Sequence, residues 1–193
     1  MKENVRSRIN SLRALLKDPE PAVRSAAAEA IEKLEATNSV TGIIATLKTG
    51  DMGAKIGAIY ALGEIGGEKV LPPLVYCAQR PEVDIRSASA TALGRLALPA
   101  ALTTLIKLLG DENPTVQSRA IAALRNFPVS PDILNKLRPF LNASDGVLEA
   151  EAALTLAELN DQPSLGQIRE LLTSPHASTR QAAATALSII PLQ

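Results

Sequence analysis

The feature that most constrains this chain is a pattern that recurs six times at an almost constant period. Each copy has an apolar residue, a usually polar or charged one, then small residues, and ends in Ala or Thr followed by Leu or Ile. A period of this length predicts a solenoid, in which each unit buries its apolar face against its neighbours. The copies are spaced by 31, 31, 31, 32 and 31 residues and begin at Val23, Ala54, Ile85, Val116, Leu148 and Thr179.

Each copy predicts a helix, because its apolar residues fall on one helical stripe. In the third copy these residues are Ile85, Ser89, Ala92, Leu93 and Leu96. A first helix is predicted before each copy, because a second apolar column has the same period: Leu12, Ile43, Leu74, Leu105, Leu137 and Ile168. The second helices should start at Glu20, Asp51, Glu82, Asn113, Asp145 and His176, of which three are preferred N-caps.

The sequence therefore predicts an all-α fold of six helical hairpins, with about twelve helices and no sheet. We expect a single repeat domain over residues 1–193. Its units should cover about residues 4–36, 37–67, 68–98, 99–129, 130–161 and 162–193.

The segment from Gly63 to Leu74, with Asp18-Pro19 and Val23-Arg24 upstream, resembles HEAT repeats of the short, phycobilisome-lyase-like type. The resemblance covers essentially the whole chain. It implies a right-handed α-solenoid whose second helices line the concave surface. Because such repeats serve as general scaffolds, the fold by itself does not give the function.

Charge and cysteine content limit the function classes. Twenty basic side chains balance twenty acidic ones, so no global field draws the protein to nucleic acid or to an anionic membrane. One cysteine excludes an internal disulfide framework, and no uncharged run is long enough to span a bilayer. We expect a cytoplasmic protein.

No residue pattern predicts catalysis, a cofactor or a metal site. His176 is the only histidine and is interpreted as a turn residue. Cys77 lies in a mostly apolar column and is interpreted as a small buried hydrophobe. We therefore expect no enzymatic activity from this chain alone.

One polar column follows the first apolar position of each copy and reads Arg24, Lys55, Arg86, Gln117, Glu149 and Arg180. The family resemblance implies that arginines at this place join a ladder of ion pairs and hydrogen bonds to aspartates in the turns. Asp18 and Asp111 match those turn positions, and the other copies interrupt the ladder. The functional alternative is a basic strip for phosphate, which Gln117 and Glu149 break.

A partner is expected on the side of the second helices opposite the buried stripe, at the third, seventh and tenth positions of each copy. These positions are small and weakly charged, and several are apolar, which is typical of interaction surfaces. The structural alternative is that the curvature of the solenoid packs adjacent second helices together, so that the small residues serve packing and the groove is closed. The candidate contacts are Ile56, Tyr60, Thr91, Ala122, Arg125, Leu154 and Ala157.

The last helix offers a second candidate surface, because Leu187, Ile189, Ile190 and Leu192 follow one another without a polar cap. The first hypothesis is a non-enzymatic scaffold that binds a protein or peptide in the groove or at this C-terminal face, where self-association is another option. The alternative is a subunit of a bilin lyase or a phycobilisome-associated factor, as the repeat subtype implies. Few aromatic residues argue against a tetrapyrrole site, and the neutral net charge argues against a nucleic-acid-binding repeat protein.

Overall fold

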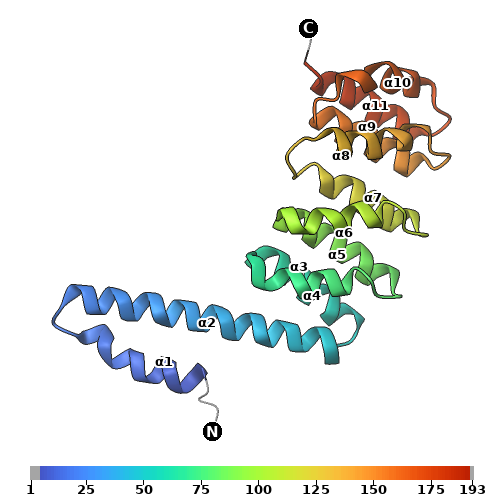
Figure 1. The fold of residues 1–193 in the computed structure, drawn as a ribbon. Helices are drawn as coiled ribbons and strands as arrows, with labels where there is room; N and C mark the ends of the chain where they lie inside the picture. Colours follow the sequence, from blue (N-terminus) through green and yellow to red (C-terminus); the bar gives the residue numbers. More distant parts are fainter. Residues whose placement is uncertain (1–4, 192–193) are drawn as a thin grey trace. The chain divides into compact units, whose positions relative to one another are not determined.

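The computed structural model describes residues 5–191, without the side chains of residues 6 and 36–38. Over that range the chain forms eleven α-helices joined by short 3-10 turns, and it contains no strand (Figure 1). The predicted all-α fold is confirmed. The helices are α1 (Val5–Arg13), α2 (Pro21–Thr49), α3 (Met52–Ile65), α4 (Leu71–Cys77), α5 (Val83–Leu96), α6 (Leu102–Leu108), α7 (Pro114–Leu124), α8 (Pro131–Leu137), α9 (Gly146–Glu158), α10 (Leu165–Glu170) and α11 (Ala177–Ile189).

The chain divides into two compact units, Met1–Ala58 and Ile59–Gln193, each of which is described by itself. The expectation of one cooperative array of six units stays a prediction. In the first unit, α1 packs against α2, and Ile9 and Ala27 are buried.

One predicted helix boundary in the first unit is wrong. The second helix of the first hairpin and the first helix of the next form one continuous helix, α2, of 29 residues. The predicted unit boundary at residues 36 and 37 therefore falls inside a helix, which accounts for eleven helices instead of twelve among the described residues. The sequence between Glu35 and Val40 contains neither Gly nor Pro, whereas the later junctions contain one or the other.

The second unit is a stack of helical hairpins. The pairs α4/α5, α6/α7, α8/α9 and α10/α11 follow one another in chain order, and each of α5, α7 and α9 packs against the next second helix (Figure 1). The core lies between first and second helices and is built from aliphatic side chains. Its largest fully buried members include Leu74, Leu93, Leu105, Ile121, Leu124, Ile133, Leu137, Leu141, Leu156 and Ile168.

The turn chemistry inside the hairpins is as the sequence predicts. Each residue of the predicted cap column precedes the first residue of a second helix. Asp51, Asn113 and Asp145 are the three preferred N-caps, and each accepts a hydrogen bond from a backbone N–H in the first turn that follows. Pro21 and Pro114 occupy the first helical position, where a missing N–H is tolerated.

The C-terminal prediction can be followed only in part, because Leu192 lies outside the described residues. Between residues 5 and 191, no helix is both long and apolar enough to cross a bilayer.

Candidate functional site

A narrow stripe of side chains on the second helices of the second unit stays accessible, and we call it the accessible stripe. Its members are half-buried or exposed. They are Asp84, Thr91 and Arg95 on α5; Thr115, Arg119 and Ala122 on α7, with Asn126 just after it; Val147, Glu151, Leu154 and Glu158 on α9; and Ser178, Thr185 and Ile189 on α11.

The tenth position of the copies, predicted to face the groove, is instead used for packing. A Cβ built on Gly94 would lie 2.6 Å from the Cβ of Ala123 on the next second helix. A Cβ on Gly63 would lie 3.0 Å from that of Ala92. Ala157, in the same column of α9, is 1% exposed. At this column the helices pack together, so Ala157 lies outside any surface that a partner can reach.

The helical wheel misplaced this column for a physical reason. The wheel assumes one buried direction, whereas a second helix in a stack contacts its own first helix and also the second helices before and after it. The buried arc is therefore wider than one stripe. On α5, α7 and α9, which have a second helix on either side, the seventh column stays accessible, whereas Gly94 and Ala157 of the tenth column are buried.

The seventh-position candidates are all on the accessible side. Tyr60 on α3 is 37% exposed, and Thr91, Ala122 and Leu154 are half-buried. Ile56 is half-buried and belongs to the first unit. The structure thus brings Thr91, Ala122 and Leu154 onto consecutive second helices, where they form the apolar to weakly polar centre of the accessible stripe.

Arg125 interrupts the close packing between α7 and α9. It occupies the tenth column, where the other second helices of this unit have Gly63, Gly94, Ala157 and Ser188. Its guanidinium bonds to the carboxylates of Glu151 and Glu158, the second at 3.0 Å, and to the hydroxyl of Thr155 at 3.4 Å. The candidate Arg125 is therefore engaged within the chain, and it joins α7 to α9 through charges rather than through small side chains.

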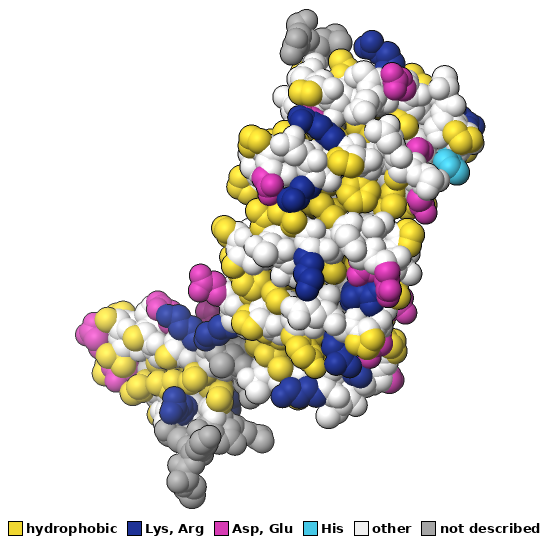
Figure 2. Space-filling model, turned by 45° about the vertical axis from the view of Figure 1, so that its right-hand side comes forward, with side chains coloured by type: hydrophobic (Ala, Val, Ile, Leu, Met, Phe, Trp, Pro, Cys, Tyr) yellow, Lys and Arg dark blue, Asp and Glu magenta, His cyan; other side chains and the backbone are white. Residues whose placement is uncertain are grey.

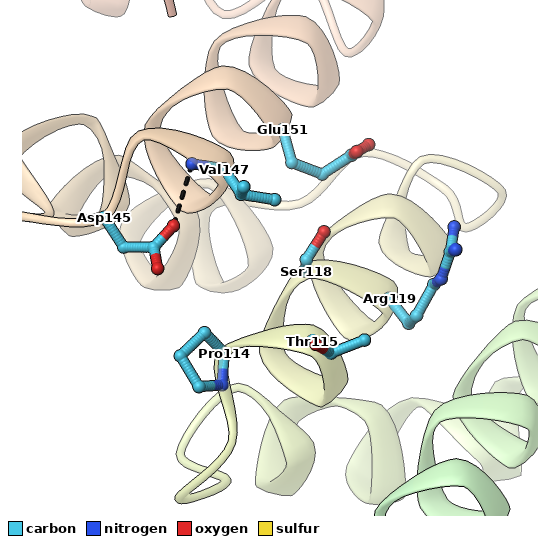
Figure 3. A pocket seen from close by; sticks show the side chains of 7 residues that line it. All are labelled: Pro114, Thr115, Ser118, Arg119, Asp145, Val147 and Glu151. Atoms are coloured by element: carbon cyan, nitrogen blue, oxygen red, sulfur yellow. Dashed lines mark hydrogen bonds between the residues drawn. The ribbon is translucent and has the colours of Figure 1, made fainter. Parts of the chain in front are cut away.

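A cleft of about 340 Å³ lies beside this interface, between the first turns of α7 and α9 (Figure 3). Ser118 points from α7 towards α9, and Asp145 is held in place by accepting the N–H of Val147 at 2.8 Å. The cleft is polar with an apolar edge. Its lining residues are Pro114, Thr115, Ser118, Arg119, Asp145, Val147 and Glu151.

The carboxylate of Glu151 at the cleft is paired with an arginine outside the cleft lining. Arg119 and Glu151 both line the cleft, but the ion pair with Glu151 is made by Arg125. Burial raises the pKa of Glu151, while the charges of Arg125 and Arg119 lower it, and the pKa lies above its ordinary value. Arg119 itself stays exposed on the cleft wall. Sequence reasoning missed this cluster, although an arginine in a column of small residues was the signal for it.

The arginine column forms capping contacts and one complete ladder rung. Arg24, Arg86 and Arg180 each donate from Nη1 to the carbonyls six and five residues before them. Arg86 also binds the carboxylate of Asp111 through Nε and Nη2, at 2.7 and 2.9 Å. The carboxylate of Asp18 accepts only the N–H of Glu20 among the described residues. These contacts give the arginines a structural role.

Glu149 replaces the arginine of this column with a hydrogen-bond acceptor, and it still contacts the next hairpin. It stands in the arginine column, and its carboxylate accepts hydrogen bonds from Ser174 at 3.2 Å and from Thr179 at 2.9 Å. Ser174 occupies the turn position that Asp111 fills in the fourth hairpin. The interruption predicted at Glu149 is therefore a substitute contact between the fifth and sixth hairpins.

A second buried ion pair was not predicted. Arg138 binds the carboxylate of Asp161 at 2.9 and 2.7 Å, and Ser164 donates its hydroxyl to the same group. Asp161 is 2% exposed. Burial raises its pKa, but the bonds from Arg138 and Ser164 outweigh this and hold the pKa below its ordinary range. The cluster ties α8 to the turn before α10 and is structural.

The residues considered for chemistry also have structural settings. Cys77 is a free thiol, 5% exposed, and its burial raises its pKa, which confirms its interpretation as a buried hydrophobe. The ring of His176 lies against Gly146, where a Cβ would be 2.5 Å from its Cγ. Within the described part of the chain, no group of three or more acidic, His or Cys residues is placed to hold a metal ion.

Charges of both signs are interspersed over the face drawn in Figure 2. Several of them pair between consecutive second helices, as Arg95 does with Glu64 at 3.1 Å. Exposed pairs of this kind stabilise by only about 0–1 kcal/mol. A mixed surface fits a protein partner better than a polyanion, which requires clustered cations.

The sequence matches the family of HEAT repeats over residues 9–92, 71–146 and 134–193. No curated protein matches it. Among solved structures, the complex of CpcE and CpcF of phycocyanin lyase from Nostoc sp. PCC7120 is similar with a TM-score of 0.64 and 23% identity, over 78% of this chain and 98% of that one.

Two further solved structures are similar as well. An engineered protein gives a TM-score of 0.55 and 22% identity, over 95% of this chain and 96% of that one. A designed armadillo repeat protein in complex with peptide (KR)4 gives 0.57 and 17%, over 96% and 100%. At these identities the similarity shows the fold alone. Together with the family match, it confirms the resemblance to HEAT repeats.

Proposed function

The chain belongs to the HEAT-repeat family, and we propose that it is a non-enzymatic scaffold that binds an extended segment of a partner protein along the accessible stripe of its second unit. The fold supports an interaction role, since HEAT and armadillo solenoids present rows of second helices to their ligands. One similar armadillo structure is itself a peptide complex. A free, buried Cys77 supports a reducing compartment such as the cytoplasm.

The observation that carries the proposal is the cleft between α7 and α9, which opens onto the accessible stripe. Ala122 and Leu154 provide a half-buried apolar centre one helical turn beyond it. Arg119 and Glu151 flank that centre with opposite charges. A partner segment would seat an apolar side chain on Ala122 and Leu154, and would place an acidic and a basic side chain at the two flanking charges.

The test begins with peptides selected from a displayed random library on the wild-type protein. Their affinities are then measured for Leu154→Glu and for Val129→Glu. Val129 is 55% exposed in the connection between α7 and α8, so its variant adds the same charge outside the accessible stripe. Loss of an apolar contact together with burial of a charge should weaken binding by at least about tenfold for Leu154→Glu. Equal peptide affinities for both variants would show that the partner does not bind at the accessible stripe.

The two tyrosines give a second matched comparison. Tyr60 lies at the seventh position of α3, whereas Tyr76 lies on the first helix α4, is 63% exposed and contacts Arg80. If the binding surface extends to α3, Tyr60→Ala should weaken binding and Tyr76→Ala should not. The reverse order would place the partner on the first helices.

The alternative function is that of a bilin lyase subunit. Its support is the structural similarity to the CpcE–CpcF complex. None of the seven residues that line the α7/α9 cleft is aromatic, so the cleft offers no stacking surface for a conjugated tetrapyrrole. Addition of a bilin to the purified protein tests this directly, because binding in a defined site shifts the visible absorption spectrum of the pigment.

A further inference from the structure

The pair of Arg86 and Asp111 shows how one hairpin of this chain is fastened to the next. Arg86 uses Nη1 to hold the carbonyls of Arg80 and Pro81, at 3.0 and 2.6 Å. Its Nε and Nη2 bind both oxygens of the Asp111 carboxylate, and Asp111 also accepts the N–H of Asn113 at 2.9 Å. Both side chains are less than a tenth exposed. Hydrogen bonds within each hairpin thus position the guanidinium and the carboxylate independently of the ion pair between them.

Arg180 in the last hairpin reproduces the arginine half of this pair. Its Nη1 holds the carbonyls of Ser174 and Pro175 at 2.8 and 3.1 Å, as Arg86 holds its own two carbonyls. Its Nε and Nη2 bind no other described residue. The side chain is exposed on α11. A guanidinium edge that is positioned in this way is ready to take a carboxylate.

Asp18 in the first hairpin reproduces the acidic half. Its carboxylate accepts the N–H of Glu20 at 2.9 Å, as Asp111 accepts that of Asn113. Both aspartates stand three residues before a proline that opens a second helix. No basic side chain in the described part of the chain binds the Asp18 carboxylate. The acidic half of such a pair therefore lies in the first hairpin of this sequence and the arginine half in the sixth.

The surfaces around the two halves are also complementary. In the α3/α5 and α5/α7 contacts, a glycine at the tenth position lies against an alanine at the eighth position of the next second helix. The corresponding residues here are Ser188, which is exposed on α11, and Ala30 on α2, and both are small. Apolar side chains accompany them: Leu172 and Ile189 at the last hairpin, and Leu15 and Leu16 at the first, are 39–40% exposed. In other hairpins the equivalent positions are buried. The residues equivalent to Leu15 are Cys77, Leu108 and Leu171 in the third, fourth and sixth hairpins. Those equivalent to Leu16 are Ala78, Leu109 and Leu141 in the third to fifth hairpins.

We propose that the chain self-associates head to tail, with the last hairpin of one copy stacked on the first hairpin of a second copy and Arg180 bound to Asp18 of that copy. The contact is heterologous, because it joins two different surfaces. The surface that one contact leaves unused on each copy can bind a further copy, so association continues with concentration unless the rotation closes a ring.

The test uses the wild-type chain and two charge-reversed variants, Asp18→Arg and Arg180→Glu. In sedimentation equilibrium over roughly 10 µM to 1 mM, where contacts of modest area associate, the average mass of the wild type should rise with concentration. Each variant alone should stay a monomer, because like charges would meet at every contact. An equimolar mixture should associate again, since Arg180 of the Asp18→Arg variant can bind Asp18 of the Arg180→Glu variant, and the two reversed positions carry opposite charges that can pair with each other.

Matched controls separate this contact from general charge effects and from misfolding. Asp51→Arg changes another turn aspartate that accepts a backbone N–H, and Lys107→Glu reverses an exposed cation on α6. Both should associate like the wild type. The milder Asp18→Asn, which keeps the bond to Glu20, should still weaken association about tenfold, as expected for loss of a charged partner. A wild type that remains monomeric throughout, or a mixture of the two reversed variants that does, overturns the proposal.

Discussion

Gly94→Ala tests whether consecutive second helices pack with their backbones in contact. A new Cβ would lie 2.6 Å from the Cβ and 2.8 Å from the Cα of Ala123. Ordinary carbon contacts begin near 3.5 Å, so α5 and α7 would have to separate by about 1 Å. Alanine gains up to about 1 kcal/mol over glycine in a helix, while overpacking of this kind costs about 1–3 kcal/mol and also loosens the surrounding contacts. We expect a net loss of about 1–2 kcal/mol in the free energy of unfolding.

Two further glycines calibrate the measurement. Gly166 on α10 has no neighbour within 4 Å of a built Cβ, so Gly166→Ala should stabilise the same unit by about 0.4–1 kcal/mol. Gly63→Ala, with a built Cβ 3.0 Å from Ala92, should fall between the two. With a urea m-value of about 2 kcal/mol/M, the unfolding midpoints of the Gly94 and Gly166 variants should differ by about 1 M.

A double-mutant cycle identifies the contact responsible. Ala123→Gly removes the nearest atom that the new methyl meets, so the Gly94→Ala/Ala123→Gly pair should be more stable than the sum of the single effects predicts. Circular dichroism during urea unfolding gives all four stabilities. A Gly94→Ala variant at least as stable as the wild type would show that α5 and α7 do not approach closely at this point, and hence that the tenth column is not a close contact between second helices.

Three other predictions concern titratable groups. Since the folded-state pKa of Asp161 lies below its unfolded value of about 3.9, the stability from its bonds to Arg138 is present above about pH 4 and is lost as the pH falls through the folded-state pKa. Asp161→Asn should therefore flatten the dependence of urea stability on pH below about 4. The carboxyl of Glu151, followed by carbon-13 NMR, should titrate above the usual value of about 4.3, and Arg125→Ala should raise its pKa further because that cation lowers it; an unchanged value would show that the ion pair does not form. The buried thiol of Cys77 should react with a disulfide reagent only as fast as the second unit opens, and should react at once in denaturant; rapid labelling of the native protein would contradict its burial.

The sequence predicted those parts of the fold that depend on local chemistry. The N-caps Asp51, Asn113 and Asp145 are at the starts of their helices, because a cap needs only its own turn. The continuous helix α2 was missed because hydrophobic period alone does not end a helix, and no Gly or Pro between Glu35 and Val40 does so. The absence of a helix-breaking residue is visible in the sequence, and it predicts the continuous helix better than the regular period does.

The candidate site was less predictable because it depends on contacts between hairpins. Ala157 was placed on the wrong side since a helical wheel contains no information about the next helix in the stack. The partner of Glu151 depends on the same packing. Arg119 lies on α7 and Arg125 is the C-cap of that helix, and which of them reaches Glu151 depends on how far apart α7 and α9 stand. Periodicity determines the columns, and only the packed helices determine which columns face solvent.

Two departures from the repeat coincide at the α7/α9 interface. Arg125 replaces the small residue of the tenth column. The extra residue in the 32-residue spacing falls just after it, since Leu124 and Leu134 are ten positions apart where Leu93 and Leu102 are nine apart. A large side chain in a close-packed column would be a defect if it were left unsatisfied, yet its guanidinium bonds to Glu151 and Glu158 of α9 and to the carbonyl of Ala122. The cleft beside it therefore belongs to an interface that charges hold open, and a polar opening of this kind can accept a ligand without exposing the core.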